Sequence, residues 1–269
     1  MTSATGEDRL ARAALGFVAD PGDPALGALL RHCPPAEIVA ALAAGRHPLN
    51  SRPQAAAARW EAGRPDEHGR PDEHGSPWQR DGIRGLDRAL QRWGARIGQV
   101  PTAARLADWH RDGLRLICPG DAEWPTQLDD LGEASPVALW LRGSADLRFA
   151  SLRSVSVVGA RAATAYGSHV GTEMAAALAE RGWAVVSGGA FGIDSAAHRG
   201  ALAADGVTVA VLASGLSYGY PRSHFELFEA IAAQGVLVSE MPPDRRPTRP
   251  GFLIRKSQSR AYAQVKWGM

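Results

Sequence analysis

Short apolar runs alternate with amphipathic helical segments across residues 154–239, and this alternation restricts the fold more than any other feature of the chain. Glycine marks the seams between segments, at Gly182, Gly206 and Gly235. The repeated order of an apolar run, a helical segment and another apolar run is the βαβ pattern of a parallel sheet. We therefore predict a Rossmann-like, doubly wound α/β domain with a mostly parallel sheet. The expected strands are Ser154–Val158, Ala184–Ser187, Val207–Leu212 and Val236–Ser239, and the expected helices are Tyr166–Arg181, Ile193–Ala204 and Ser223–Gln234.

A small helical domain is expected before this sheet. Proline- and aspartate-rich turns separate three short amphipathic segments near the N-terminus. These segments are typical either of a SAM-like or helix-hairpin-helix-like nucleic-acid module or of a packing accessory, and the residues leave both open. The expected helices are Asp8–Val18, Pro24–Arg31, Pro34–Ala44 and a second helical part over Gly85–Trp109, and the strands Leu114–Pro119 and Val137–Gly143 follow.

We predict three regions: a helical region over 1–110, an extended Rossmann-like domain over 111–256 and an atypical basic tail over 257–269. A direct repeat, Arg64–Gly69 and then Arg70–Gly75, lies in the segment 63–77. Each copy holds Asp, Glu and His, which are metal ligands. Proline and glycine exclude a regular helix there, so a duplicated surface loop is the favoured interpretation and no metal site is predicted.

The charge distribution indicates an anionic partner. The chain has 30 basic and 28 acidic residues, a formal net charge of +2, but residues 151–269 carry 12 basic and 8 acidic side chains. A local basic excess in the predicted Rossmann-like half suits a polyanion. The hydrophobic fraction of 45% is ordinary for a globular protein and excludes a disordered one.

No segment of the sequence indicates a membrane or an export signal. No apolar run approaches the ~20 residues that span a bilayer, and Met1–Leu10 lacks an apolar signal core. We therefore expect a cytoplasmic protein without a membrane anchor. In that compartment Cys33 and Cys118 are expected to be buried thiols rather than a disulfide.

Turns rich in glycine and hydroxyl groups follow three of the predicted strands, at Gly159–Arg161, Ser187–Gly192 and Ser214–Leu216. Ligands of such sheets bind beyond the carboxyl ends of the strands. Glycine lets the backbone approach an anion closely, and the helix that follows offers free N–H groups. We predict a phosphate-binding site whose candidate residues are Gly159, Arg161, Thr164, Ser187, Gly188, Gly189, Phe191 and Gly192.

No cofactor or catalytic group is predicted. Neither turn fits the dinucleotide fingerprint, and a Walker lysine is absent. Asp194 and His198, four residues apart on one helix face, suit a catalytic pair. Asp194 also suits a helix N-terminus and His198 a structural hydrogen bond, so both interpretations stay open, as they do for His224 and Glu240.

Basic and aromatic residues alternate near the C-terminus. Cations suit phosphates and aromatic rings suit exposed bases, which is the combination found in single-strand binding. The candidates expected beside the strand ends are Arg249, Phe252, Arg255 and Lys256.

Five ordered motifs over roughly 100 residues resemble the DNA-processing protein A family (DprA, also called Smf). They are Val158–Arg161 with Thr164–Gly167, Ser187–His198, Val211–Leu216 with Tyr220-Pro221 and His224, Ser239–Pro243, and Pro250–Phe252. The resemblance implies a bacterial cytoplasmic protein that is not an enzyme. It also implies binding of single-stranded DNA during natural transformation, homodimer formation and loading of the RecA recombinase. The DNA groove would be lined by Gly159, Arg161, the Ser187–Gly192 loop and the basic residues around Arg255.

Two departures from the family pattern affect this expectation. Ala160 stands where the family usually has serine, and Lys256–Arg260 replaces the expected Asn-Arg and apolar helix. We therefore expect a truncated or frameshifted member that lacks the last sheet strand and the C-terminal winged-helix module. The alternatives are a nucleotide-processing enzyme of the phosphoribohydrolase type, whose Pro-Gly-Gly-x-Gly-Thr-x-x-Glu motif is absent, or an inactive remnant.

Overall fold

The computed structural model describes residues 5–51, 83–247, 262–263 and 265–268. Its first half is helical. The elements are α1 (Gly6–Val18), α2 (Pro24–Leu30), α3 (Pro35–Ala43), the 3-10 turn η1 (Pro48–Ser51), α6 (Ile83–Gly94), η2 (Ile97–Gln99) and α7 (Ala103–Arg111). The expected second helical part is thus two helices, because Gly98 and Pro101 interrupt it and Thr102 caps α7 by accepting a hydrogen bond from the Arg105 N–H.

The remaining elements alternate between strand and helix. They are β1 (Arg115–Ile117), η3 (Thr126–Ala134), β2 (Leu139–Gly143), α8 (Leu147–Leu152), β3 (Ser154–Val158), α9 (Ala165–Glu180), β4 (Ala184–Gly188), α10 (Ile193–Ala203), β5 (Thr208–Val211), η4 (Arg222–His224), α11 (Phe225–Gln234), β6 (Val236–Ser239) and β7 (Val265–Gly268).

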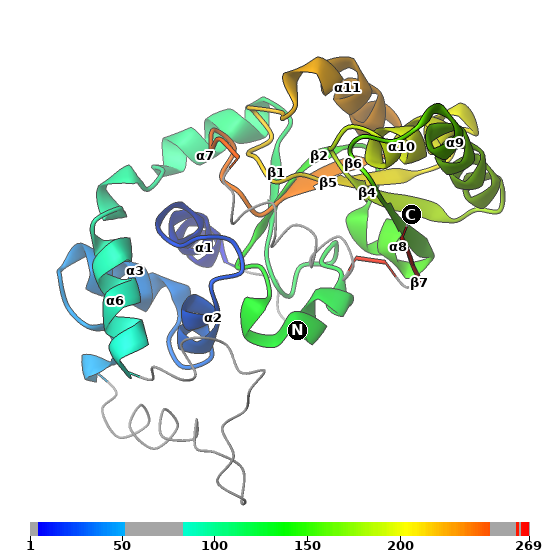
Figure 1. Cartoon of the computed structure of the whole chain (residues 1–269). Helices are drawn as coiled ribbons and strands as arrows, with labels where there is room; N and C mark the ends of the chain where they lie inside the picture. Colours follow the sequence, from blue (N-terminus) through cyan, green and yellow to red (C-terminus); the bar gives the residue numbers. More distant parts are fainter. Residues whose placement is uncertain (1–4, 52–82, 248–261, 264, 269) are drawn as a thin grey trace, which may run out of the picture.

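Within the described part of the chain, the strands form one seven-stranded sheet in the order β1-β2-β6-β5-β4-β3-β7. Neighbours from β6 to β7 run parallel, whereas β1 and β2 pair antiparallel at the other edge. The crossovers between successive parallel strands place α9, α10 and α11 on one face, and α8 covers the other (Figure 1). The predicted Rossmann-like fold, doubly wound and mostly parallel, is confirmed.

Alternate residues of the parallel strands face opposite helical layers. Val186 on β4 pairs with Val209 on β5, and both pack in one core cluster with Leu147 of α8. Val185, one residue earlier, packs with Ala197 of α10 instead. The inner strands are buried on both faces, which explains why they read as nearly continuous valine runs.

The last strand corrects an expectation. The departure from the family pattern after Arg255 predicts that the last sheet strand is missing, but Val265–Gly268 pairs with β3 in parallel as β7. Val265 lies beside Val155, and Trp267 beside Val157. Valine and tryptophan favour extended backbone, and this pairing satisfies the N–H and C=O groups that an open edge of β3 would expose. The predicted basic tail therefore includes a sheet strand.

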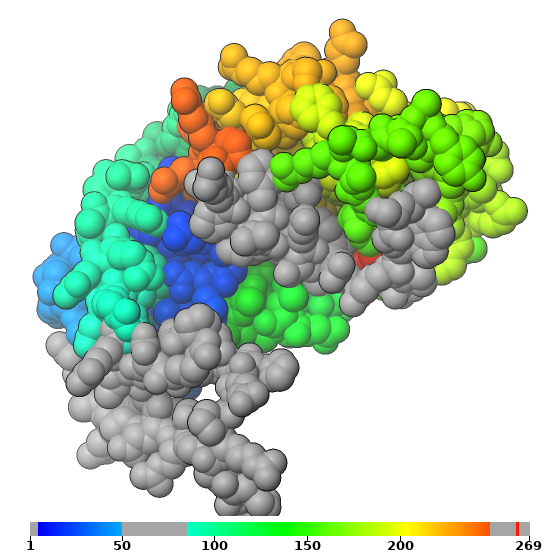
Figure 2. Space-filling view, viewed as in Figure 1, coloured from blue at the N-terminus to red at the C-terminus, as the bar shows by residue number. Residues whose placement is uncertain are grey.

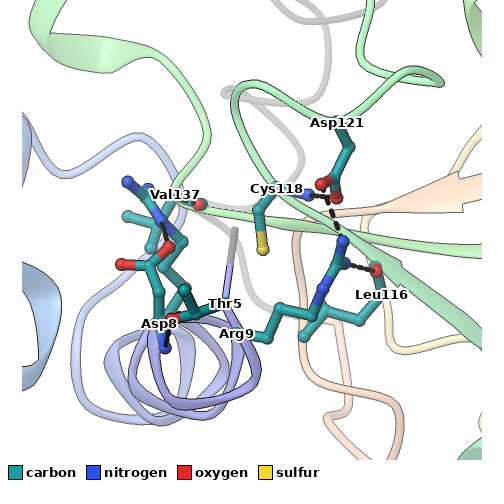
Figure 3. Close-up of polar contacts among 8 residues, drawn as sticks. Thr5, Asp8, Arg9, Leu116, Cys118, Asp121 and Val137 are labelled. Carbon is teal, nitrogen blue, oxygen red and sulfur yellow. Dashed lines mark hydrogen bonds and ion pairs between the residues drawn. The ribbon is translucent and has the colours of Figure 1, made fainter. Parts of the chain in front are cut away.

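Two arginines of α1 attach the helical lobe to the sheet (Figure 3). Arg9 donates hydrogen bonds to the Leu116 carbonyl (2.8 Å) and the Asp121 carboxylate (2.7 Å), and Arg12 donates to the Val137 carbonyl (3.1 Å). Asp121 is nearly buried and also accepts the Cys118 N–H at 2.8 Å. The Arg9–Asp121 ion pair is thus an inter-lobe clamp.

Further contacts attach the same lobe to the end of β6. The Glu240 carboxylate, buried, accepts the Gly22 N–H at 3.0 Å. Arg105 of α7 pairs with Asp244 at 2.7 Å, and Figure 2 shows the orange segment before residue 248 lying beside the cyan-green α7 region. These contacts fix the helical lobe beside the carboxyl ends of the strands.

Both cysteines are free and buried, as predicted. Burial raises the pKa of the Cys118 thiol to about 12. No helix within the described ranges is long and apolar enough to cross a bilayer. The repeat at 63–77 lies outside the described residues.

Helices α9 and α10 meet through small residues. A Cβ added at Gly200 of α10 would lie 2.1 Å from the Thr172 carbonyl oxygen of α9, so the backbones touch directly. The Thr172 hydroxyl donates to the Ala196 carbonyl at 3.3 Å across the same seam. The two helices therefore pack directly against each other, and each begins after the carboxyl end of a parallel strand.

We expect Gly200→Ala to lower the free energy of unfolding by about 1–3 kcal/mol, because α9 and α10 must separate to admit the methyl group. Gly16→Ala is the matched control, since a Cβ on this α1 glycine meets nothing within 4 Å. It should leave stability unchanged or raise it by up to about 1 kcal/mol. Urea unfolding followed by circular dichroism measures both, and equal stabilities would contradict the close contact.

Candidate nucleic-acid interface

The carboxyl ends of β3, β4 and β5 meet at one edge of the sheet, and each is followed by a connection that leads to a helix. The connections lead to the N-termini of α9 at Ala165, α10 at Ile193 and α11 at Phe225. Helix N-termini carry unpaired N–H groups and a partial positive charge. This edge is where open parallel sheets bind their ligands.

The first two predicted motifs are in direct contact. Gly192 has φ of +76°, and a Cβ there would lie 2.2 Å from the Ala160 carbonyl oxygen. The Ile193 N–H donates to the same carbonyl at 3.2 Å. Only glycine combines this backbone angle with so close an approach. The structure therefore brings the Gly159–Arg161 turn and the Gly188–Gly192 loop together.

Arg161 and Thr164 stand at the outside of this contact. The Arg161 side chain is exposed, and Gly159 behind it is half-buried. Thr164 is the N-cap of α9, and its hydroxyl accepts the Gly167 N–H at 3.0 Å. An exposed guanidinium beside a capped helix start is suited to holding a phosphate.

Ser187 and Gly188 lie beneath the surface instead. The Ser187 hydroxyl is fully buried and donates to the Val157 carbonyl at 2.6 Å, which ties β4 to β3. The Gly188 carbonyl contacts Nε2 of His198 at 2.9 Å, and Nδ1 of that ring contacts the Thr208 hydroxyl at 2.7 Å. These groups support the loop and do not face solvent.

The Asp194–His198 pair has the geometry of structural support. Asp194 is buried in the first turn of α10, and its carboxylate accepts the Ala190 N–H at 3.3 Å. His198 is fully buried with both ring nitrogens against protein atoms. Neither group is presented to a substrate, so the geometry favours the structural interpretation over the catalytic one.

His224 contacts the backbone of Gly189, the next residue of the loop. Its Nδ1 contacts the Gly189 carbonyl at 3.2 Å, and its ring lies between Phe191 and Phe228. Burial is the largest cause that lowers the pKa of His224 below 6.5, and the charge of Arg199 lowers it further. The bond to the Gly189 carbonyl and the charge of Asp194 oppose this shift.

Phe191 is the loop residue that faces outward. Its ring is 51% exposed and meets His224 edge to face, with 4.6 Å between ring centroids. Tyr166, in the first turn of α9, is 78% exposed. Tyr166 was not among the predicted site residues, although its position just after a strand-end turn was a usable signal.

Most of the exposed aromatic rings lie near this edge of the sheet. Among the described residues, seven large hydrophobic side chains are exposed. Phe149 and Val207 line a groove at the amino ends of the strands, and Leu152 ends α8. The other four follow the carboxyl ends of β3, β4 and β5. These four are Tyr166, Phe191, Tyr220 and Phe225. We define the carboxyl-edge site as Gly159, Arg161, Tyr166, Phe191 and Gly192.

The remaining predicted residues cannot be placed here. Arg249, Phe252, Arg255 and Lys256 lie outside the described residues. Over the described ranges, no group of three or more His, Cys, Asp or Glu side chains could hold a metal ion.

Comparison with known proteins identifies the family to which this sequence is similar. The profile of DNA recombination-mediator protein A matches residues 115–263, more than half of the chain. The chain is 54% identical over 123 residues to a Mycobacterium tuberculosis protein assigned as DNA processing protein DprA, covering 46% of this chain and 32% of that one. It is 37% identical over 103 residues to DNA processing protein DprA of Bacillus subtilis, covering 38% and 35%. The chain therefore spans about a third of the length of these relatives.

Two solved structures share the fold. DNA processing protein A from Streptococcus pneumoniae aligns with a TM-score of 0.58 and 27% identity over 66% of this chain and 61% of that one. The protein of the same name from Helicobacter pylori, which has a unique single-stranded DNA binding mode, aligns with a TM-score of 0.51 and 27% identity over 58% and 68%.

The strand-end turns, the buried histidines and Phe191 all lie inside the segment that the family profile matches. The fold and the sequence comparisons therefore agree, and the chain belongs to the DNA recombination-mediator protein A family, the DprA/Smf family of DNA processing proteins.

Proposed function

We propose that this chain binds single-stranded DNA at the carboxyl-edge site. Phosphates would bind the Gly159–Arg161 turn with its exposed guanidinium, while a base would stack on Phe191 or Tyr166. Sequence preference would be weak, because backbone groups and ring faces accept any nucleotide.

The observation that carries the proposal is the placement of Phe191. A half-exposed aromatic ring, which contacts His224, directly precedes Gly192, and Gly192 approaches the backbone of Arg161, whose side chain is exposed. An exposed ring in water is unfavourable unless it meets a partner. Bases within a duplex are already stacked, so such a ring is useful to a single strand and of little use to a double one.

Binding without catalysis fits the chemistry of the loops. The buried carboxylate of Asp194 and both imidazoles are engaged with the loop's own backbone. We propose that the protein acts as a binding protein and not as an enzyme. The Helicobacter pylori relative, by its single-stranded DNA binding mode, supports this choice.

Family membership supports a further part of the proposal. We infer that the protein works in the cytoplasm during natural transformation, as a homodimer that loads RecA onto incoming DNA. Sedimentation equilibrium tests the dimer. The rate of RecA filament formation on single-stranded DNA, with and without the protein, tests loading.

Arg161→Ala should weaken binding to unrelated single-stranded oligonucleotides by about tenfold and reduce the slope of log affinity against log salt by about 0.7, because one phosphate contact is lost.

Phe191→Ala should weaken binding by about 5- to 150-fold, the range for one stacked base. Fluorescence anisotropy with single- and double-stranded DNA across salt concentrations measures both.

Phe149→Ala is the matched control for Phe191→Ala. Phe149 is 70% exposed but belongs to α8, on the opposite face of the sheet. Its removal should leave DNA affinity unchanged. Wild-type affinity in both Arg161→Ala and Phe191→Ala would contradict the proposed site.

The support of Phe191 by His224 has a pH dependence. Burial lowers the pKa of folded His224 below 6.5, so the unfolded chain binds more protons as the solution becomes acidic. The stability that neutral His224 contributes is present above pH 6.5 and is lost as pH falls through the folded pKa. Urea midpoints at about pH 7.5 and about pH 5 should therefore differ more for wild type than for His224→Gln. An equal fall in the urea midpoint between the two pH values in both proteins would contradict the neutral, buried state of His224.

A further inference from the structure

We propose that Thr208 and His198 are positioning residues for the Gly188–Gly192 loop. In this arrangement the Thr208 hydroxyl donates to Nδ1 of His198, and the neutral ring donates from Nε2 to the Gly188 carbonyl. The inference rests on the proposed function, because the loop that these residues hold carries Phe191. It deepens that function by naming side chains that keep the loop in its binding conformation.

Thr208 places a buried hydroxyl in an otherwise apolar strand. β5 (Thr208–Val211) is buried along its whole length, and its other three residues are valine or alanine. Valine and alanine suit a strand covered on both faces, whereas a hydroxyl without exposed surface needs a hydrogen-bond partner. The Thr208 Oγ1 lies 2.7 Å from Nδ1 of His198 and 2.8 Å from the Val185 carbonyl oxygen. Its single proton therefore has two acceptors within reach.

The contacts of His198 restrict where its own proton lies. Nε2 is 2.9 Å from the Gly188 carbonyl oxygen, and a carbonyl can only accept, so Nε2 must carry a proton to make this hydrogen bond. A neutral imidazole then has a bare Nδ1, which needs a donor. The Thr208 hydroxyl is at hydrogen-bond distance from Nδ1 and can supply its proton. The hydroxyl thus selects the tautomer that holds the Gly188 carbonyl.

The other two protonation states of the ring fit this environment less well. The opposite neutral tautomer would place a nitrogen lone pair against the Gly188 carbonyl oxygen, so the 2.9 Å contact would be repulsive. An imidazolium would donate from both nitrogens, but the His198 side chain has no exposed surface, and burial disfavours the charged form. The nearby Asp194 carboxylate accepts the Ala190 N–H. The neutral ring with its proton on Nε2 is therefore the state that fits best.

Three side chains contact two consecutive peptide planes at the start of the loop. His198 contacts the carbonyl of Gly188, which belongs to the first plane. His224 contacts the carbonyl of the second plane at 3.2 Å, and the Asp194 carboxylate accepts the N–H of that plane at 3.3 Å. A planar peptide unit turns as one body, so holding its carbonyl also orients its N–H. The orientation of the first plane therefore follows the position of the His198 ring.

These peptide planes direct Phe191 from the near end of the loop. Phe191 lies three residues beyond Gly188 and directly precedes Gly192, whose close approach to the Ala160 carbonyl fixes the far end. A loop that is fixed at both ends loses little conformational freedom when a ligand binds. If the Gly188 carbonyl turned away from His198, the near end would be released while the sheet beneath it stayed folded. The hydrogen-bond chain that begins at Thr208 therefore acts on binding as well as on stability.

Nitrogen-15 NMR of the histidine rings in the full chain tests the tautomer directly. The signals of His198 are those that disappear in His198→Gln. At about pH 7.5, Nε2 should be protonated and Nδ1 should be an unprotonated acceptor. Thr208→Val removes the hydroxyl at nearly constant shape, so the Nδ1 signal should move toward that of a nitrogen without a hydrogen bond.

Thr172→Val is the matched control for Thr208→Val, since the Thr172 hydroxyl donates to the Ala196 carbonyl and not to a histidine. It should leave both ring signals of His198 unchanged. A ring that is protonated on Nδ1, alone or together with Nε2, would overturn the proposal.

Two substitutions of His198 separate positioning from packing. The side-chain nitrogen of glutamine can reach the place of Nε2, whereas that of asparagine reaches the place of Nδ1. His198→Gln should bind an oligothymidylate of about 16 nucleotides within about twofold of wild type, because it keeps a donor at the Gly188 carbonyl. His198→Asn should bind the same strand at least about fivefold more weakly. Fluorescence anisotropy measures affinity, and thermal unfolding should show a similar loss of stability in both variants, since both lose the ring.

His110→Asn is the matched control, because His110 is an exposed histidine of α7, and it should leave affinity and stability at wild-type values. Equal losses of affinity in the two His198 variants, or wild-type affinity in His198→Asn, would overturn the positioning role and leave the proposed function standing. Wild-type protein that binds no single-stranded DNA would overturn the proposed function, while the ring spectra would still decide the hydrogen-bond chain.

Discussion

The structure of the candidate interface depends on glycine residues at which one backbone segment packs directly against another. At Gly192 the β4 loop lies against the Ala160 and Arg161 carbonyls, and at Gly200 α10 lies against α9. A methyl group at either position would separate elements that carry the candidate phosphate-binding groups. The helix N-termini, the exposed arginine and the exposed ring lie at one edge of the sheet. The segments that carry them can pack this closely because glycine has only a hydrogen atom as its side chain.

Beneath the glycines, two imidazoles supply the polar partners that a buried loop requires. His198 and His224 contact the carbonyls of consecutive residues, Gly188 and Gly189. Buried carbonyls without partners would cost free energy and let the loop relax. Histidine is suited to this role because its ring fills apolar space while either nitrogen can donate. The pair directs Phe191 outward without itself meeting solvent.

Local patterns predicted most of the fold and part of the site. Strand β3 begins and ends at the predicted residues, and the strand-end turns placed Gly159, Arg161 and Gly192 together. The burial of Ser187 could not be predicted, because it depends on the pairing of β4 with β3, where the Ser187 hydroxyl donates to the Val157 carbonyl. Strand β7 was missed because a short segment after an atypical stretch carries little periodicity of its own. The Arg9–Asp121 pair joins residues 112 positions apart, a separation that no local pattern encodes.

The inter-lobe clamp has a consequence for how the molecule unfolds. Arg9 cannot leave Asp121 without stranding a charge on a nearly buried carboxylate, and Glu240 cannot release Gly22 without a similar loss. The helical lobe and the sheet are thereby coupled into one cooperative unit, in which the loss of either removes partners from the other. The helical lobe beside the carboxyl ends of the strands is therefore expected to keep its structure until the whole molecule unfolds.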